Sequence, residues 1–478
     1  MENKFEAIPQ HKRKKILLIC DDIRVHSGVA TVAKEIVVHT CHHFNWVQMA
    51  GAIQHPEVGK KLDISHDTNK LAGIEDSSVF IYPTNGYGDA RSLRALLNIE
   101  NPDAIFLITD PRYFQWVFQM EEEIRANIPI VYLNIWDDLP APQYNEEFYD
   151  SCDALFGISK QTVAINKIVL GDKADSKVIK YVPHGLDEKK YFPLEKETEE
   201  YKKFKNRYTR GKDKDFILFF NSRNIRRKSI PDAIAAWKLF TDDLSKAEKD
   251  KALFILHTEP VSDHGTDLPA VIEYIMGPED ESVIISQAKI PHQEMNYLYN
   301  MADAVILLSS AEGWGLALTE SLLTGTPFIA NVTGGMQDQM RFVDENGDWY
   351  TNSIEMPSNQ FGTYTEHGEW ALSVYPKAMG MVGSPITPYI WDSRCDFRDA
   401  KKRIIELYNM SKDERKKIGN SGREWATGDE AGFTAAHMGE RFIKIIDKLF
   451  STWTPREKFT FSKDTDYEPR RLKHKLEY

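Results

Sequence analysis

Cysteine is scarce in this chain, and long apolar runs are missing from it. The four cysteines among its 478 residues are Cys20, Cys41, Cys152 and Cys395. None of them lies in Cys-x-x-Cys spacing, which disfavours a disulfide scaffold and favours reduced thiols in a cytoplasm. The amino end is polar, and the first apolar stretch, 16–20, is far too short to span a membrane. We therefore expect a cytoplasmic protein without a transmembrane segment.

The chain also has no excess of positive charge. Its 60 basic and 72 acidic residues give a formal net charge of −12, which disfavours non-specific attraction to DNA or to an anionic membrane. Basic side chains nevertheless concentrate in the stretch 202–228. We interpret this stretch as a solvated linker that leads into a phosphate site, and contact with a polyanion is the alternative interpretation.

The length of the chain predicts two domains with a cleft between them, because 478 residues exceed one ordinary hydrophobic core. Apolar runs of strand length alternate with segments of helical length, first over 16–182 and again from 216 onwards. This alternation is typical of an α/β fold with two doubly wound, Rossmann-like parallel sheets. Ligands of such sheets bind beyond the carboxyl ends of the strands, so we expect the two sets of loops to face each other.

A polar run over 195–214 separates the two alternating regions. We therefore assign residues 1–195 to a first domain and residues 196–430 to a second. Helical periodicity over 433–450 predicts a late helix that packs back on the first domain.

Two further segments have no clear periodicity. The segment 344–391 is rich in glycine, proline and aromatic residues, and we interpret it as an irregular insertion that forms a lid or an acceptor loop. Residues 451–478 are charged and patternless, which predicts a tail or an arm.

The most informative motif is Glu312-Gly-Trp-Gly-Leu-Ala-Leu-Thr-Glu320. An apolar strand precedes it at 304–308, and a helix is predicted over 316–324. The glycines at 313 and 315 remove side chains where the backbone would meet a ligand, and the free N–H groups of Gly315 and Leu316 form an anion site. The two carboxylates would repel a phosphate, so hydroxyl groups are their expected partners. A site that binds a diphosphate with its backbone and hydroxyl groups with two glutamates fits a nucleotide sugar.

A cationic turn follows the first predicted strand of the second domain. It reads Asn221-Ser-Arg-Asn-Ile-Arg-Arg-Lys-Ser229, and it lies where a diphosphate at the strand's carboxyl end needs neutralising. Arg223 and Lys228 are the expected pair, since a guanidinium binds phosphate bidentately and an ammonium acts as a point charge.

In combination, these motifs resemble glycosyltransferase family four. The resemblance covers about residues 16–340 and rests on Ser27-Gly28-Val29, Val182-Pro-His-Gly-Leu-Asp187 with Tyr191-Phe-Pro193, Arg223 with Lys228, Glu312-x7-Glu320, and Thr333-Gly334-Gly335 with Asp338. It implies the GT-B fold and retaining transfer of a sugar from a nucleotide donor. The first domain would then be the acceptor side, and the second would bind the nucleotide sugar.

The resemblance also implies roles for single residues. Arg223 and Lys228 would hold the donor diphosphate in place of a metal ion, so that no metal and no further cofactor is needed. Glu312 would contact the transferred sugar, and Glu320 would hold the ribose hydroxyls. The predicted donor-binding residues are Glu320, Gly28, Gly313, Trp314, Gly315, Leu316, Gly334 and Gly335.

One position departs from the pattern of the family. Many members carry a histidine after the fifth strand of the first domain, near the sugar and the acceptor, whereas this chain reads Ile135-Trp136-Asp137-Asp138. We assign a catalytic role to Asp137, beside Glu312, Arg223 and Lys228. Asp110 is a second candidate for the acceptor side, although an aspartate before proline is often only a cap.

The acceptor stays open between a glycan, a lipid-linked sugar, a small molecule and a modified DNA base. A glycosyltransferase of hydroxymethylated DNA bases is one alternative function, which the basic stretch permits. A non-catalytic protein that only binds a nucleotide sugar is the other alternative.

Overall fold

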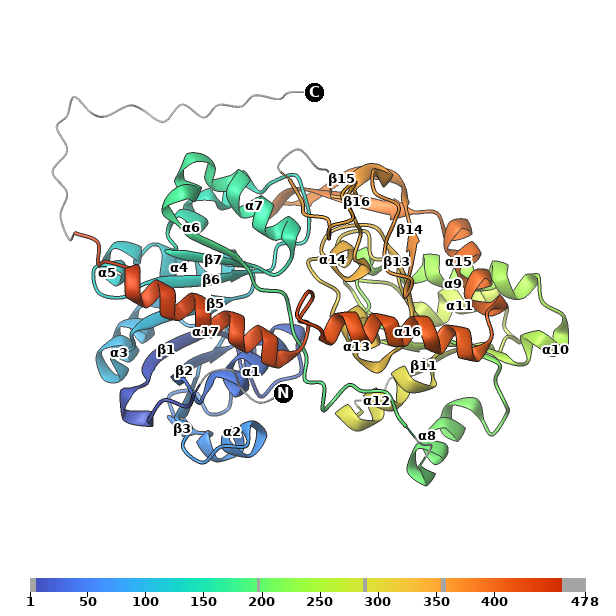
Figure 1. The fold of residues 1–478 in the computed structure, drawn as a ribbon, viewed down its shortest axis with the longest axis horizontal. Coiled ribbons are helices and arrows are strands. Elements are labelled where there is room, and N and C mark those ends of the chain that lie inside the picture. Colours follow the sequence, from blue (N-terminus) through green and yellow to red (C-terminus); the bar gives the residue numbers. More distant parts are fainter. Residues whose placement is uncertain (1–5, 196–197, 287–289, 354–357, 458–478) are drawn as a thin grey trace.

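The computed structural model describes residues 6–195, 198–286, 290–353 and 358–457, which form two α/β domains side by side (Figure 1). The sheet of the first domain has the order β3-β4-β2-β1-β5-β6-β7-β8, and all its neighbours are parallel except β3 and β4. Its strands are β1 (Lys14–Asp21), β2 (Phe44–Gly51), β3 (Leu62–Asp63), β4 (Val79–Pro83), β5 (Ala104–Ile108), β6 (Ile130–Asn134), β7 (Ala154–Gly157) and β8 (Val178–Tyr181). Central strands such as β5 are buried along their whole length, because helices cover both faces of the sheet.

The helices of the first domain connect these parallel strands. They are α1 (Gly28–Thr40), α2 (Ser65–Ala72), α3 (Ala90–Glu100), α4 (Gln115–Phe118), α5 (Glu121–Arg125), α6 (Glu146–Asp150) and α7 (Lys160–Leu170). Side-chain caps define the starts of the longer ones. Ser27, Asp89 and Ser159 each accept a hydrogen bond from the third backbone N–H after them, at the starts of α1, α3 and α7.

The second domain has a parallel sheet of order β11-β10-β9-β12-β13-β14. Its strands are β9 (Phe216–Asn221), β10 (Ala252–His257), β11 (Val283–Ser286), β12 (Ala304–Leu307), β13 (Phe328–Asn331) and β14 (Ala371–Val374). Its helices are α8 (Glu199–Thr209), α9 (Ile230–Asp242), α10 (Lys246–Lys249), α11 (Leu268–Met276), α12 (His292–Met301), α13 (Leu316–Thr324), α14 (Met336–Met340), α15 (Phe397–Asn409) and α16 (Lys412–Thr427). The expected pair of doubly wound parallel sheets is confirmed.

The region expected as a solvated linker contains helix α8. Its Tyr201 and Phe204 are buried and lie against the ring of Tyr297 in α12, with ring centroids 5.4 and 5.5 Å apart. The linker interpretation of this part of the chain is therefore wrong. Together with the partly buried Tyr208, these two residues hold an otherwise polar helix on the domain.

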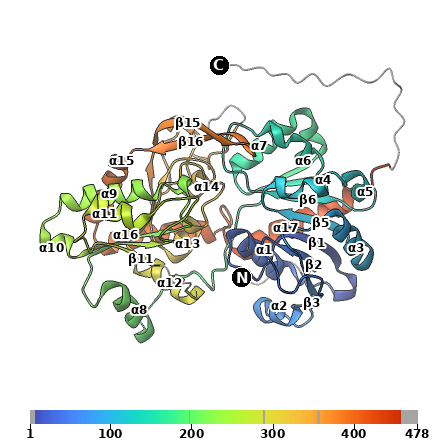
Figure 2. The same ribbon diagram turned by 180° about the vertical axis from the view of Figure 1, so that it is seen from behind.

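The segment 344–391, expected to be irregular, contains regular structure. It supplies the edge strand β14 and most of a hairpin of β15 (Pro376–Ser384) and β16 (Thr387–Cys395). The hairpin extends from the second domain towards α7 of the first (Figures 1 and 2). There the Trp391 N–H donates to the Leu139 carbonyl at 2.8 Å, and Tyr144 Oη donates to the Tyr389 carbonyl at 3.3 Å. The irregular assignment was wrong for 371–391, where glycine and proline interrupt the alternation of the strands, whereas the described residues of 344–370 contain turns and one short 3-10 helix.

The chain passes between the domains twice, and the two passages run side by side. The Leu186 N–H donates to the Phe433 carbonyl at 3.1 Å, and the Ala435 N–H donates back to the Leu186 carbonyl at 2.9 Å. A Cβ atom on Gly185 would collide with the Thr434 carbonyl, so only glycine permits this close approach. The two passages form a short two-stranded connection between the domains.

After the second passage, helix α17 (Ala435–Thr452) returns to the first domain and lies along it (Figure 1). Its fully buried Phe442 contacts the rings of Phe106, Trp46 and Phe44, with centroids 4.9, 5.7 and 6.1 Å away. Through this aromatic cluster, the last described helix packs into the core of the first domain. The helix predicted over 433–450 and its contact with the first domain are both present.

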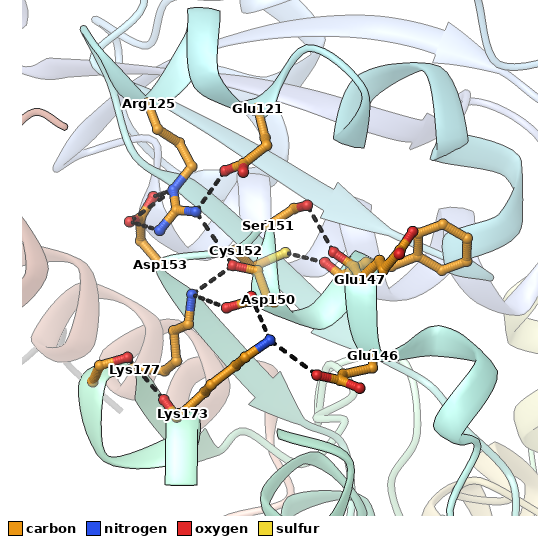
Figure 3. A network of polar contacts seen from close by, with 12 residues as sticks. Glu121, Arg125, Glu146, Glu147, Asp150, Ser151, Cys152, Asp153, Lys173 and Lys177 are labelled. Carbon is orange, nitrogen blue, oxygen red and sulfur yellow. Dashed lines mark hydrogen bonds and ion pairs between the residues drawn. The ribbon is translucent and has the colours of Figure 1, made fainter. Parts of the chain in front are cut away.

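The chain beyond α17 is tied to the same domain by a buried arginine. Arg125 pairs with Asp153 and Glu121 at 2.8 and 2.6 Å, in the network that Figure 3 shows. The Arg456 N–H donates to the Arg125 carbonyl at 2.8 Å, and the Arg456 guanidinium pairs with Glu121 at 3.1 Å. Most of the predicted tail, from residue 458 onwards, lies outside the described residues.

Among the described helices, none has the length and apolar character needed to cross a membrane.

Replacing Phe442 by alanine is expected to lower the free energy of unfolding by about 3–5 kcal/mol, because it removes a buried aromatic ring and leaves a cavity. Urea denaturation followed by circular dichroism measures this change. Lys444→Ala, at an exposed position of the same helix, is the matched control and should change the free energy by about 0.5 kcal/mol or less. Equal effects of the two variants would contradict the docking of α17.

Candidate active site

The loop that carries Glu312 connects β12 to α13 at the carboxyl edge of the second sheet. Helix α13 begins at Leu316 and ends at Thr324, as the sequence predicts. Gly315 precedes it with φ of +88°, a left-handed conformation that favours glycine. Among the described residues, no acceptor contacts the N–H groups of Gly315 and Leu316. The start of the helix therefore presents free donors and the positive end of its dipole.

Glu312 is held by two cations and a hydroxyl group. Its Oε2 accepts hydrogen bonds from Lys228 Nζ, from Arg227 Nη1 at 2.8 Å and from Ser309 Oγ at 3.1 Å. Both the Glu312 and the Lys228 side chains are only 9% exposed. Burial by itself would raise the pKa of Glu312, but the charges of Arg227 and Lys228 outweigh it and lower the pKa to about 2. Glu312 therefore keeps its negative charge throughout the physiological range.

For Lys228, by contrast, the effect of burial on the pKa outweighs that of the neighbouring charges. Burial lowers its pKa from the usual value, and the attraction of Glu312 acts against that shift. Lys228 reaches Glu312 because it lies in the short turn after β9, and β9 is the neighbour of β12 in the sheet. The sheet order thus brings the expected cation and the expected carboxylate together.

Glu320 lies one turn into α13 and is oriented by three donors. Its Oε1 accepts from Tyr191 Oη at 3.1 Å, and its Oε2 accepts from Asn221 Nδ2 at 2.9 Å and from Tyr299 Oη. Burial raises its pKa, although the three hydrogen bonds act in the other direction. Sequence reasoning missed Asn221 and Tyr299. Asn221 stands at the end of β9. A polar residue directly after an apolar run could have indicated a site residue at this position.

The start of α1 meets the start of α13 at the domain boundary. A Cβ atom on Gly28, the first residue of α1, would lie 3.4 Å from Leu316 Cδ1. Ser27 caps α1 by accepting from the Ala30 N–H at 3.0 Å, and its own hydroxyl donates to Asp21 at 2.5 Å. Two helix starts therefore meet at one place, which is favourable for an anion.

Asp137 contacts the Glu312 loop from the first domain. Its Oδ1 accepts from the Gly313 N–H at 3.1 Å, and its Oδ2 lies 3.4 Å from Arg227 Nε. A Cβ atom on Gly313 would lie only 2.8 Å from the Ile135 carbonyl oxygen, so this contact requires glycine. Asp137 thus faces the second domain and takes part in the junction of the two domains.

Three of the predicted donor-binding residues have packing contacts in the structure. The Gly335 N–H donates to the Glu312 carbonyl at 2.9 Å, and a Cβ atom on Gly334 would collide with that same carbonyl. The Trp314 side chain is buried against Phe433, with centroids 4.9 Å apart. These residues support the backbone of the Glu312 loop, and their contact with a donor stays a prediction.

The two arginines of the cationic turn differ in position. Arg223 is exposed, and among the described residues its side chain has no hydrogen bond or ion pair. Arg227 instead reaches Glu312, the Ala311 carbonyl at 2.8 Å and Asp137. Sequence reasoning placed Arg227 in the basic turn without giving it a role. Its neighbour Lys228 was the signal that pointed to this part of the turn.

The other charges of the basic stretch are largely paired. Arg210 and Lys212 share Glu281 at 2.8 and 3.6 Å, and Arg207 pairs with Glu294 at 3.4 Å. Asp110 caps the turn that follows it and holds the guanidinium of its neighbour Arg112. Within the described ranges, no group of three His, Cys, Asp or Glu side chains is arranged to hold a metal ion.

A second carboxylate of the first domain is buried at the junction. Asp138 is fully buried, and its Oδ2 accepts from Thr333 Oγ1 of the second domain at 3.2 Å. Its Oδ1 accepts from Gln161 Nε2 at 3.0 Å and from the Leu139 N–H at 2.7 Å. Burial raises the pKa of Asp138 to about 7 against the effect of these hydrogen bonds.

The variant Asp138→Asn is expected to flatten the dependence of stability on pH. The unfolded chain releases this proton near pH 4, whereas the native protein holds it up to about pH 7. Between these values the native state binds the extra proton, so the free energy of unfolding falls as pH rises, by at most roughly 1.4 kcal/mol per pH unit. Urea midpoints at several pH values between 4.5 and 8 measure the slope.

Asparagine does not titrate, so the variant should gain stability relative to the native chain as the pH rises from 4.5 to 8. Asp263→Asn, at an exposed loop position, removes the same formal charge and serves as the control. Parallel curves for the native chain and Asp138→Asn would show that this carboxyl group does not titrate in that range.

Comparison with known proteins identifies the second domain. Residues 201–347 match the family model described as glycosyl transferases group 1. No curated protein matches the chain. The matched residues contain the cationic turn, the Glu312 loop and α13, so the matched region and the candidate site coincide.

Solved structures resemble the whole chain. HepE from Anabaena, in complex with UDP and glucose, has a TM-score of 0.63 at 13% identity, over 91% of this chain and all of HepE. Sucrose-phosphate synthase from Thermosynechococcus elongatus has a TM-score of 0.64 at 14% identity, over 92% of this chain and 100% of that one. At these identities the likeness establishes the fold. With the group 1 domain over 201–347, the comparisons show a glycosyltransferase with the two Rossmann-like domains of the GT-B fold.

Proposed function

We propose that the protein transfers a sugar from a nucleotide sugar to a hydroxyl acceptor with retention at the anomeric carbon. The observation that carries this proposal is the meeting of Lys228, Arg227 and Glu312 beside the start of α13. Free backbone donors and cations suit a diphosphate, and a permanently ionised carboxylate beside them suits the hydroxyl groups and the developing positive charge of a sugar.

The leaving group is the nucleoside diphosphate. The bond from the anomeric carbon to the diphosphate oxygen breaks, and both electrons of that bond stay with the diphosphate. The acceptor oxygen forms the new bond to the anomeric carbon, and its proton passes to the departing diphosphate oxygen. Lys228, Arg223 and the N–H groups of Gly315 and Leu316 stabilise the charge that develops on the diphosphate, in the place that a metal ion takes in other sugar transferases.

The two glutamates act on the two sugars of the donor. Glu312 contacts the transferred sugar near its reacting carbon, and its low pKa keeps it an acceptor of hydrogen bonds. Glu320 receives the ribose hydroxyls, and the donors Tyr191, Tyr299 and Asn221 set the direction in which its carboxylate points. Gly28 allows the first domain to approach this ligand closely.

UDP-sugars are the first donors to test. HepE is described with UDP and glucose, and a trehalose-6-phosphate structure from E. coli is bound with UDP-2-fluoro glucose. The latter has a TM-score of 0.60 at 11% identity, over 93% of this chain and 100% of that one. A thermal-shift screen of UDP-, GDP- and ADP-sugars selects the donor, since a ligand at 100 times its dissociation constant stabilises the native state by about 2.7 kcal/mol.

With the donor selected, the native chain is expected to release nucleoside diphosphate slowly, by transfer of the sugar to water. Glu312→Gln and Lys228→Ala should each lower the rate constant about 100-fold to 1000-fold, because each removes a preorganised charge from the reacting centre. A coupled assay of nucleoside diphosphate release measures these rates.

The matched control for Lys228→Ala is Lys444→Ala, which removes an exposed lysine far from the Glu312 loop. Release by Glu312→Gln at the native rate would refute the role of Glu312. If the native chain bound a nucleotide sugar but released no nucleoside diphosphate, the result would instead support a protein that only binds the donor.

A further inference from the structure

Arg227 contacts parts of the molecule that lie far apart along the sequence. Its carbonyl accepts from the Ser310 N–H at 2.8 Å, so its main chain is held against the loop that leads to Glu312. Its Nη1 donates to the Ala311 carbonyl and to Glu312, each at 2.8 Å. Its Nε faces Asp137 of the first domain at 3.4 Å.

The charges around Arg227 balance. Lys228 and Arg227 supply two positive charges, and Glu312 and Asp137 supply two negative ones. The guanidinium has donors in a planar fork, so it can face both carboxylates at once, which an ammonium group cannot do in the same geometry. Arg227 is therefore the one contact among these four side chains that joins a carboxylate of each domain.

Asp137 restrains the Glu312 loop at two points. One of its oxygens accepts from the Gly313 N–H, directly after Glu312, and the other faces Arg227. The first domain thus contacts both the backbone beside Glu312 and the cation that pairs with its carboxylate. If the domains moved apart, Asp137 would leave both partners, and Arg227 and Glu312 would keep only their contacts within the second domain.

We propose that Arg227 is a positioning residue of the sugar transfer: it orients the Glu312 carboxylate towards the transferred sugar, and Asp137 orients Arg227 only while the two domains are together. Asp137 then acts through Arg227. This inference rests on the proposed function. It explains why a second cation is directed at Glu312 while Arg223 stays exposed and available for phosphate.

The first test separates positioning from phosphate binding. Arg227→Ala is expected to lower the rate constant of donor hydrolysis about 10-fold to 100-fold, because a displaced reacting group loses that much. The dissociation constant of UDP, or of the nucleoside diphosphate of the selected donor, should change about threefold or less. Arg227→Lys keeps the charge and should recover part of the rate. Arg91→Ala, at an exposed position of α3, is the matched control and should leave both values unchanged.

The second test needs no donor. Arg227→Ala removes the cation that two partly buried carboxylates share and leaves Asp137 without an ion pair within the described part of the chain, while Glu312 keeps Lys228, so it should lower the urea midpoint. Adding Asp137→Asn to Arg227→Ala should raise the midpoint again, because one unpaired carboxylate is removed. Asp137→Asn should lower the hydrolysis rate in the native chain but have little further effect in the Arg227→Ala background.

The outcomes distinguish this inference from the proposed function. A native chain that hydrolyses no donor refutes the proposed function, while the urea midpoints still decide whether Arg227 and Asp137 are coupled. Additive effects of the two substitutions on the midpoint, or an unchanged hydrolysis rate in Arg227→Ala, would overturn the inference. A loss of UDP affinity as large as the loss of rate would assign Arg227 to the diphosphate instead.

Discussion

The pairing of Glu312 with Lys228 and Arg227 is the interaction on which the candidate site depends. Lys228 and Glu312 are both nearly buried, and a buried charge that loses its partner is strongly destabilising. The pair exists because β9 and β12 are neighbours in the sheet, so that the turn after one meets the loop after the other at the same edge. The parallel sheet thus places opposite charges, far apart along the chain, in one contact.

The same loop also forms the junction of the domains. The glycines at 313 and 335 leave no room for a side chain, and Asp137 approaches the loop through the space that Gly313 leaves. The relative position of the two domains is therefore part of the geometry of the site. The paired passages at Leu186 and Phe433 and the hairpin of β15 and β16 also join the domains, and both contact the Glu312 loop: Phe433 packs on Trp314, and the Ser393 N–H donates to the Ser310 carbonyl at 2.9 Å.

Several features could be read from the sequence because local chemistry specifies them. The two parallel sheets follow from apolar runs that alternate with amphipathic helices, and the bounds of α13 follow from Gly315 and Gly325 at its ends. Lys228 and Glu312 were both identified from their places after predicted strands. The hairpin was missed because Gly380 and Gly383 interrupt the alternation in β15. Helix α8 was missed because its three aromatic residues, Tyr201, Phe204 and Tyr208, are set among charged ones.

The sequence by itself determined the fold class, the glycine-containing loop that leads into α13 and the presence of two carboxylates around it, since each of these rests on neighbouring residues. The tertiary structure alone decided which arginine contacts Glu312, which donors orient Glu320 and what Asp137 faces. Those contacts join residues 85, 99 and 176 positions apart along the chain. The order of the strands and the approach of the two domains set such contacts, and no local pattern encodes either of them.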